Sequence, residues 1–407
     1  ARYVRGLRAY RAARETHASE GDDSEPTESP GVIAAYIDAA DLLTHAVEAD
    51  DAGGFPEERA GAGLMLGLAL YYKGSPAEAA DRFERTVELI EPGNAHAESL
   101  WMAVIALERA VEQGRTDLGP RLNAAVLLFV QTYPGDDRSA RLMLRFGDGA
   151  LFEAETVLGV LLGVDPDSPV FGAAQNRAAD LLYRVYVRGR EPERSDSAAR
   201  FVAVALRRID VDLELLRDAS PGDPETALLL QRLRLRIRQT LDATLTPLAA
   251  DPTSARRALS ALDELRARAG DLAGDPSGGD GLEGELAFRR LQLAVNEDDR
   301  AAQEQAHREL EAIGGRFLEA ADAFLFGRAA ERWRRTRGLD HARRVVAIGD
   351  RLLGTGEIPR SLLSTAETTA NAATAVWGAA DDREALGIAI GIDERVLSAH
   401  APTAELL

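Results

Sequence analysis

Residues 64–92 read LMLGLALYYKGSPAEAADRFERTVELIEP, and this stretch decides the fold of the 407-residue chain. Apolar and small residues recur in it at helical spacing on both sides of a turn at Gly74. The small residues Gly67 and Ala79 stand where two antiparallel helices must approach each other most closely. The stretch therefore predicts a helical hairpin. Because one hairpin cannot bury its apolar face alone, we expect neighbouring hairpins to stack on it.

The order of these residues resembles the tetratricopeptide repeat (TPR), a unit of about 34 residues with Leu-Gly and an aromatic residue on its first helix and Ala, Phe and a closing Pro on its second. The corresponding residues here are Leu66, Gly67, Ala79, Phe83 and Pro92. A weaker second match consists of Ala125, Phe129, Tyr133 and Pro134, so the resemblance covers about residues 60–134. It implies a right-handed superhelix whose inner surface binds a peptide or a partner protein.

The rest of the chain continues as helices separated by short Gly, Pro and Asp segments. We predict an amphipathic helix over 1–18, then an acidic flexible linker over 19–30, which has two prolines and no bulky apolar residue. Helical arrays are predicted over 31–269 and 282–407. Together they give an all-α, TPR-like α-solenoid of about eight stacked antiparallel hairpins.

Residues 270–281 (GDLAGDPSGGDG) are the most glycine-rich part of the chain. They are either a long loop between two helices or a hinge between two arrays. We favour the loop, because helical pairing resumes directly after the segment.

The predicted helix 225–245 tests whether helices stack on both sides of one another. One face of it has Leu230, Leu233, Ile237 and Leu241, whereas Leu228 and Leu235 lie on nearly the opposite face. We expect both faces to contact neighbouring helices. The alternating segment RLRLRIR (232–238) also fits a β-strand, but the flanking residues keep helical spacing and no partner strand is evident.

Composition excludes several classes of function. Asp and Glu number 67 against 48 Lys and Arg, which gives a net charge of −19 and disfavours nucleic acid as a partner. The chain has no cysteine, so it has no disulfides and no thiol chemistry. No apolar stretch approaches the ~20 residues of a membrane span, and we expect a soluble protein. Its compartment is open: cytoplasmic or exported, and periplasmic if a signal peptide was removed before Ala1.

Sequence motifs for catalysis and for cofactors are absent. The six histidines are spread along the chain without the spacing of a zinc site, and neither a phosphate-binding loop nor a nucleophile elbow occurs. Paired acids such as Asp136 and Asp137 stand at predicted helix starts, where they cap free N–H groups. We therefore expect no catalytic residue, no metal and no cofactor, and a protein that is not an enzyme.

Two arginine clusters are the candidates for binding a partner. Arginine forms bidentate bonds to carboxylates, and tryptophan offers a stacking surface for a cation or an apolar group. The candidate residues are Arg232, Arg234, Arg236, Arg332, Trp333, Arg334 and Arg335. The alternative is that these arginines pair with acids on adjacent helices and cover packed apolar surface.

These observations favour a scaffold that binds a protein or peptide on the inner surface of the solenoid. A variant of this hypothesis is that the scaffold is one subunit of an assembly. The other hypothesis is a small-ligand receptor or an enzyme, with a pocket where distant helices converge. A long open groove would favour peptide binding. A closed pocket with an unpaired carboxylate or histidine would favour the receptor or enzyme.

Overall fold

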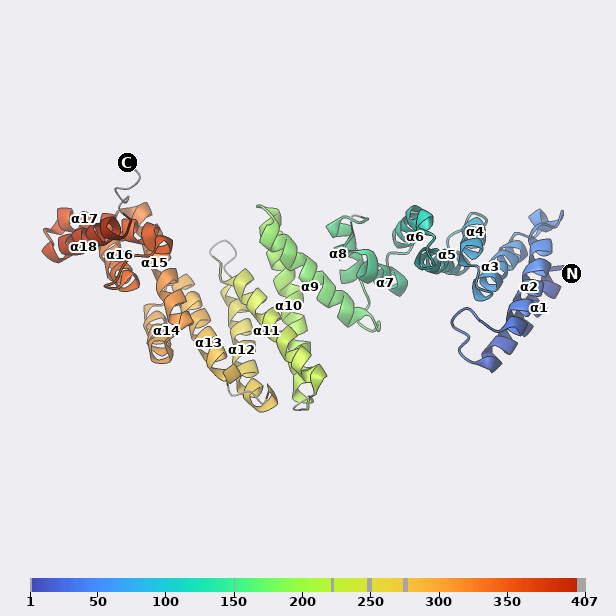
Figure 1. Cartoon of the computed structure of the whole chain (residues 1–407), viewed down its shortest axis with the longest axis horizontal. Helices are drawn as coiled ribbons and strands as arrows, with labels where there is room; N and C mark the ends of the chain where they lie inside the picture. The colour runs from blue at the N-terminus through green and yellow to red at the C-terminus, as the bar shows by residue number, and fades with distance from the viewer. Residues whose placement is uncertain (1, 150, 221–222, 247–250, 274–276, 401–407) are drawn as a thin grey trace. The chain divides into compact units, whose positions relative to one another are not determined.

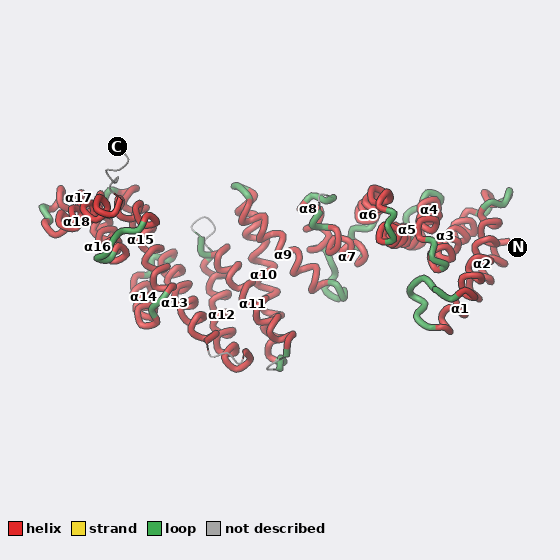
Figure 2. Tube along the Cα trace, in the orientation of Figure 1, coloured by secondary structure: helices red, strands yellow, loops and turns green. Residues whose placement is uncertain are grey.

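The computed structural model describes residues 2–149, 151–220, 223–246, 251–273 and 277–400 (Figure 1). Over these residues the chain is an all-α structure of 18 α-helices without a β-strand, and helices make up 82% of the structure (Figure 2). The α-helices are α1 (Arg2–Glu20), α2 (Pro30–Val47), α3 (Pro56–Tyr72), α4 (Pro76–Val87), α5 (Asn94–Glu112), α6 (Gly119–Thr132), α7 (Asp137–Phe146), α8 (Ala154–Leu162), α9 (Phe171–Arg188), α10 (Glu193–Arg217), α11 (Pro224–Thr244), α12 (Pro252–Ala273), α13 (Ser277–Asn296), α14 (Arg300–Ile313), α15 (Arg316–Thr336), α16 (Leu339–Leu353), α17 (Leu363–Ala380) and α18 (Arg383–His400).

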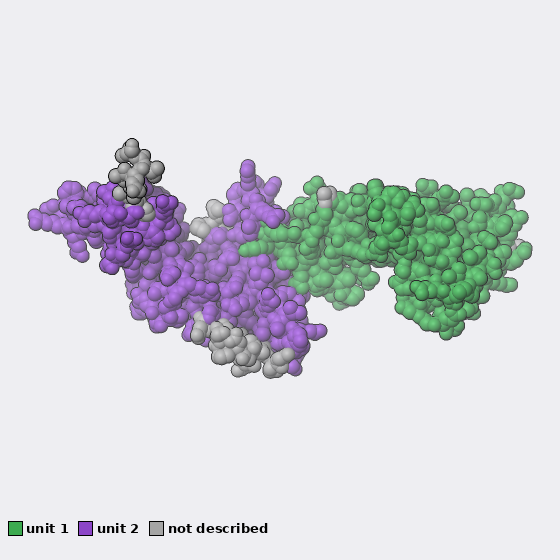
Figure 3. Space-filling model, in the orientation of Figure 1, with its two compact units in different colours: residues 1–184 green, residues 185–407 purple. Residues whose placement is uncertain are grey.

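The chain divides into two compact units, Ala1–Arg184 and Val185–Leu407 (Figure 3). From α1 to α8, and again from α10 to α18, each helix packs against the next one along the chain. Contacts to the next helix but one also occur in both units, as between α3 and α5 and between α10 and α12. This nearest-neighbour packing is that of an α-solenoid and confirms the predicted fold class.

The α3–α4 hairpin shows why the sequence 64–92 folds as predicted. A Cβ atom added at Gly67 on α3 would collide with the ring of Phe83 on α4, and both Phe83 and Ala79 are fully buried. The turn between the helices has Gly74 at φ +90°, a conformation that favours glycine. The small residues therefore do lie at the close approach of the two helices.

The N-terminal helix α1 packs along α2, where Tyr10 and Ala13 are buried. The predicted linker 19–30 is shorter in the structure, because α1 runs to Glu20 and α2 begins at Pro30, and 21–29 contain no helix. This segment is attached to α3 by a hydrogen bond from Thr27 N to Tyr72 O (3.0 Å). An ion pair between Arg14 and Asp23 (2.6 Å) attaches it to α1.

Helices occupy most of the stretch 270–281. Helix α12 runs to Ala273 and α13 begins at Ser277, and only 274–276 lie outside the described residues. A glycine in a helix costs only about 1 kcal/mol relative to alanine, so glycine content alone does not end a helix whose neighbours pack well. The structure therefore has a shorter connection here than the sequence predicted.

Helix α11 buries one face and exposes the other. Leu233, Ile237 and Leu241 are fully buried, whereas Leu228 and Leu235 are 66% and 54% exposed. The expectation that both faces contact neighbours was wrong, and so was the strand alternative for 232–238. The physical reason is that α10 and α12 also contact each other, so the three helices share one core and leave the far side of α11 uncovered.

No helix among the described residues has the length and apolarity to cross a bilayer.

Candidate functional site

The arginines of α11 that we predicted to bind a partner lie next to acidic residues of neighbouring helices. Arg232 lies 3.2 Å from Asp212 of α10, and Arg234 lies 3.6 Å from Glu285 of α13. Arg238 also contacts Glu285, at 2.5 Å. Arg236 is buried, 4% exposed. This cluster therefore agrees with the alternative to partner binding, in which the arginines pair with acids on adjacent helices.

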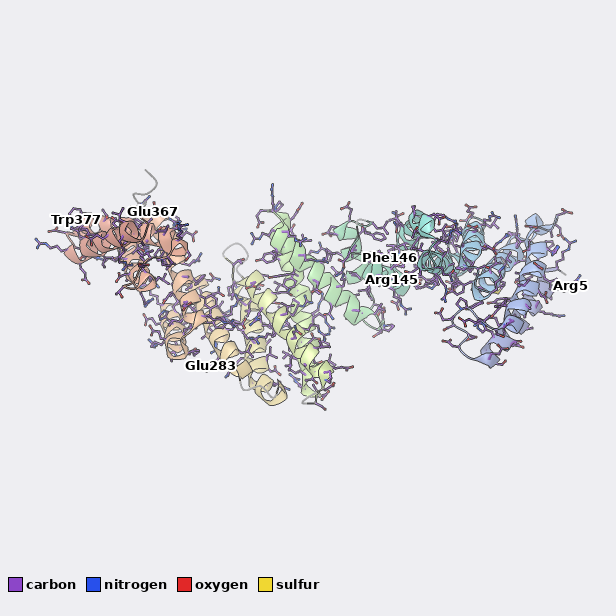
Figure 4. All side chains as sticks on the ribbon, viewed as in Figure 1. Arg5, Arg145, Phe146, Glu283, Glu367 and Trp377 are labelled. Carbon is purple, nitrogen blue, oxygen red and sulfur yellow. The ribbon has the colours of Figure 1, made fainter. Side chains whose placement is uncertain are left out.

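Two arginines compete for the same buried carboxylate in this cluster. Burial lowers the pKa of Arg234, and the cation of Arg238 adds to that effect. The hydrogen bonds to Glu285 instead raise the pKa of Arg238. Such pairing is common on this chain: Arg145 at the end of α7, labelled in Figure 4, pairs with Glu108 of α5 at 2.7 Å. An arginine cluster in the sequence is thus no evidence for a ligand unless its arginines lack acidic partners.

The second predicted cluster, on α15, is divided between the core and the surface. Trp333 is 6% exposed and packs in the core with Phe326 and Val345, and the guanidinium of Arg337 lies over its ring at 5.3 Å from the centroid. The reason for its burial is its position on the face of α15 that α16 covers. Arg334 and Arg335 are exposed, and Arg332 faces a pocket.

That pocket lies between α14, α15 and α16 and has a volume of about 820 Å³. We call it the arginine pocket. Its charged and ring-nitrogen side chains are Arg300, Arg308, Arg332, Arg344, Arg351, His307, His341, Glu304 and Asp340. Such a concentration of arginines stands out on a chain whose net charge is −19.

Two of the five arginines have acidic partners. Arg332 contacts Asp298 at 3.1 Å, and Arg351 contacts Asp322 at 2.6 Å. Asp322 is 7% exposed and also accepts from His307 Nε2 at 3.1 Å, while Glu311 lies 3.3 Å from Nδ1 of that histidine. These contacts fix one wall of the pocket by joining α14, α15 and α16.

The other three arginines have no carboxylate partner among the described residues. Arg344 contacts only the amide oxygen of Gln303, at 3.4 Å. The amide nitrogen of Gln303 donates to Ala294 O at 3.1 Å, so the side chain presents its oxygen to Arg344. Arg308 donates to the amide oxygen of Gln305 at 3.0 Å, and the Arg300 side chain makes no hydrogen bond to a described residue.

The arrangement suits an anion. A guanidinium offers a planar set of donors that match a carboxylate or a phosphate, and three guanidiniums here form no ion pair with a described carboxylate. Glu304 also lines the pocket without a basic partner, and Asp340 lies 3.9 Å from Arg343. One unpaired acid therefore opposes three unpaired arginines. Within the described parts of the chain, no three His, Asp or Glu side chains come together as metal ligands.

The sequence interpretation included Arg332 but missed Arg300, Arg308 and Arg344 as members of one site. A signal for two of them exists. Arg300, His307 and Arg308 lie on one face of the predicted helix 299–313, at a spacing of seven and eight residues. The sequence does not show that this face meets Arg332 and Arg344, because that contact depends on how α14, α15 and α16 pack.

Comparisons with known proteins give no family. No family model matches this chain, and no curated protein matches it. One solved structure, described as a "Circular tandem repeat protein with novel repeat topology and enhanced subunit contact surfaces", is 15% identical, with 98% of this chain and 96% of that chain covered and a TM-score of 0.21. At that TM-score the likeness carries no argument, and the fold described above is that of an α-solenoid on the evidence of its own helices.

Proposed function

We propose that this chain is a non-enzymatic binding scaffold of the TPR type, and that an acidic segment of a partner protein binds in the arginine pocket. The observation that carries the proposal is that Arg300, Arg308 and Arg344 line one pocket of about 820 Å³ and lack carboxylate partners among the described residues. The TPR assignment is supported by the α3–α4 hairpin, with Gly67 against Phe83.

A bound carboxylate would supply the negative charge that the three unpaired arginines of the pocket lack among the described residues. Each charge-assisted hydrogen bond contributes about 1.5–3 kcal/mol when the donor is held in place. Arg344 donates to Gln303 at 3.4 Å, and Asp298 and Asp322 pair with Arg332 and Arg351 without neutralising the other three arginines. The acidic remainder of the surface repels a free acidic chain, so we expect binding to concentrate at this pocket.

The test uses a fluorescein-labelled, glutamate-rich peptide and a counterpart with glutamine at every glutamate. Fluorescence anisotropy measures the binding of both to the full chain at low and moderate salt. We expect the glutamate peptide to bind and the glutamine peptide not to bind. The variant R300Q/R308Q/R344Q should lower the affinity for the glutamate peptide at least about tenfold, because it removes one or two charge-assisted hydrogen bonds.

The control variant is R334Q/R335Q, because both arginines are exposed on α15, have no acidic partner among the described residues and do not line the pocket. It changes charge in the same helix as Arg332 and should leave the affinity within about twofold. Equal losses in the two variants would mean that the peptide responds to overall charge, and the proposal would fail. Unaltered binding in the pocket variant would contradict it as well.

One observation favours the second candidate, a small-ligand receptor or an enzyme. The pocket volume is within the range of about 300–1,000 Å³ found for small-ligand sites, and His341 lines it without a hydrogen-bond partner among the described residues. Calorimetry with citrate and with inorganic phosphate separates the candidates. Tight binding of either anion, with no binding of the glutamate peptide, would favour the receptor or enzyme over the peptide scaffold.

A further inference from the structure

Helices α10 and α11 expose a set of apolar side chains that no described residue covers. Leu215 on α10 is 53% exposed, and Leu228 and Leu235 on α11 are 66% and 54% exposed. Val211 on α10 is 40% exposed. Single exposed leucines are ordinary, but a contiguous group on one face marks an interaction surface.

Leu215 and Leu228 lie together because of the register of the two helices. The ion pair between Asp212 and Arg232 fixes that register in the antiparallel pair. It places Leu215 beside Leu228, and indeed both line one hollow of about 420 Å³. Val211 lies about one helical turn before Leu215 on α10, and Leu235 lies about two turns after Leu228 on α11, so each continues the exposed face of its own helix. We call Val211, Leu215, Leu228 and Leu235 the leucine groove.

The rim of this groove is acidic. Asp218, Asp223 and Glu225 line the hollow, and none has a basic partner among the described residues. Among the described residues that line the hollow, Arg232 is the only basic one, and it pairs with the buried Asp212. An occupant must therefore combine apolar side chains with positive charge.

We propose that the leucine groove binds a basic amphipathic helix of a partner protein. Leu228 and Leu235 are seven residues apart, about 10.5 Å along α11, which matches the spacing of apolar residues at i and i+7 on a docked helix. Lysines or arginines flanking that stripe would meet Asp218 and Glu225. An anionic membrane and a second copy of this acidic chain are both disfavoured by the same charges. The groove shares no residue with the arginine pocket and does not depend on it.

The test uses a labelled helical peptide with leucine at i, i+3, i+4 and i+7 and lysine elsewhere, referred to as the Leu/Lys peptide. A Leu/Glu peptide keeps the leucines and reverses the charge, and a Ser/Lys peptide keeps the charge and removes the leucines. Anisotropy with the full chain should show binding of the Leu/Lys peptide alone. That binding should weaken as salt rises, because the rim charges are exposed.

Two variants locate the binding. L215S/L228S removes the apolar contacts and should lower the affinity for the Leu/Lys peptide at least about tenfold. That is the effect of leaving one or more leucines of the peptide exposed to water. D218N/E225Q removes rim charge, and neither side chain caps a helix or makes an ion pair. It should weaken binding about threefold to tenfold and flatten the salt dependence. The matched control is L397S, since Leu397 on α18 is also 66% exposed.

Three results would overturn the proposal. They are equal binding by wild type and L215S/L228S, equal binding of the Leu/Glu peptide, and no binding of the Leu/Lys peptide to the wild-type chain. Analytical ultracentrifugation adds a fourth. Concentration-dependent self-association that L215S/L228S abolishes would assign the groove to a second copy instead of a basic partner.

Discussion

The arginine pocket and the leucine groove each adjoin a buried aspartate that contacts two basic side chains. At the groove Asp212 lies 3.0 Å from Arg208 and 3.2 Å from Arg232. At the pocket Asp322 lies 2.6 Å from Arg351 and 3.1 Å from His307. A buried carboxylate is stable only with such partners, so each aspartate fixes the side chains around it.

The two regions differ in what remains after these pairs form. At the groove Asp212 pairs with Arg232, the only arginine among the described residues that line the hollow. What remains are exposed leucines with an acidic rim. At the pocket Asp322 contacts Arg351 and His307 but leaves Arg300, Arg308 and Arg344 unpaired. The character of a surface on this chain is thus set by which arginines the buried acids bind, and not by where arginines cluster in the sequence.

The largest expected effect separates core from surface near the pocket. Trp333→Ala removes a side chain that is 6% exposed and should lower the free energy of unfolding by about 3–5 kcal/mol. Trp377→Ala is the control, because Trp377 at the end of α17, labelled in Figure 4, is 39% exposed. Its loss should be under about 1 kcal/mol. Urea unfolding followed by circular dichroism measures both, and similar losses would contradict the placement of Trp333 in the core.

The next effect compares the two aspartates directly. Asp212→Ala leaves Arg208, which is 8% exposed, without its counter-ion and should cost about 3 kcal/mol in the free energy of unfolding. Asp322→Ala should cost about 2 kcal/mol, because the Arg351 side chain is 49% exposed and can turn to water. The same urea experiment gives the order. A smaller loss for Asp212→Ala than for Asp322→Ala would break the comparison.

A gain of affinity is expected when the unpaired acid of the pocket is neutralised. Glu304→Gln should strengthen binding of the glutamate peptide about twofold, or roughly 0.5 kcal/mol, because it removes a repulsion between exposed charges. Raising the salt should shrink the difference. Weaker binding in this variant, measured by anisotropy, would show that Glu304 does not face the bound peptide.

The smallest effect concerns the stability of the leucine groove. Leu228→Ala should change the free energy of unfolding by less than about 0.5 kcal/mol, because the side chain is 66% exposed and contributes little to the core. Leu233→Ala, at a fully buried position on the same helix, should cost about 2–5 kcal/mol. Comparable losses for the two variants would mean that something covers Leu228.

The sequence predicted the helices well because their ends carry local signals. Gly74 and Pro76 mark the turn and the start of α4, and Asp223 caps α11 through its bond to Glu225 N at 3.0 Å. Helical periodicity also placed Leu230, Leu233, Ile237 and Leu241 on one face, of which Leu230 is half-buried and the other three are fully buried. These features depend on residues close in sequence, and they can therefore be predicted from local propensity and periodicity.

The sequence could not predict which helix faces stay uncovered or which arginines stay unpaired. Leu228 and Leu233 read alike as apolar residues, and only the contact between α10 and α12 decides which is buried. Arg234 and Arg238 read as a free basic cluster until Glu285, about fifty positions away, is placed beside them. The candidate site depends on contacts between residues far apart in sequence, and periodicity says nothing about those.

The central claim is that the second unit has two separate binding surfaces for partners of opposite charge. The most direct measurement is anisotropy of the glutamate peptide and the Leu/Lys peptide with the full-length variants R300Q/R308Q/R344Q and L215S/L228S. We predict that the first variant loses only the glutamate peptide and the second loses only the Leu/Lys peptide, each by at least about tenfold. Loss of both peptides in one variant, or retention of both in either, would contradict the claim.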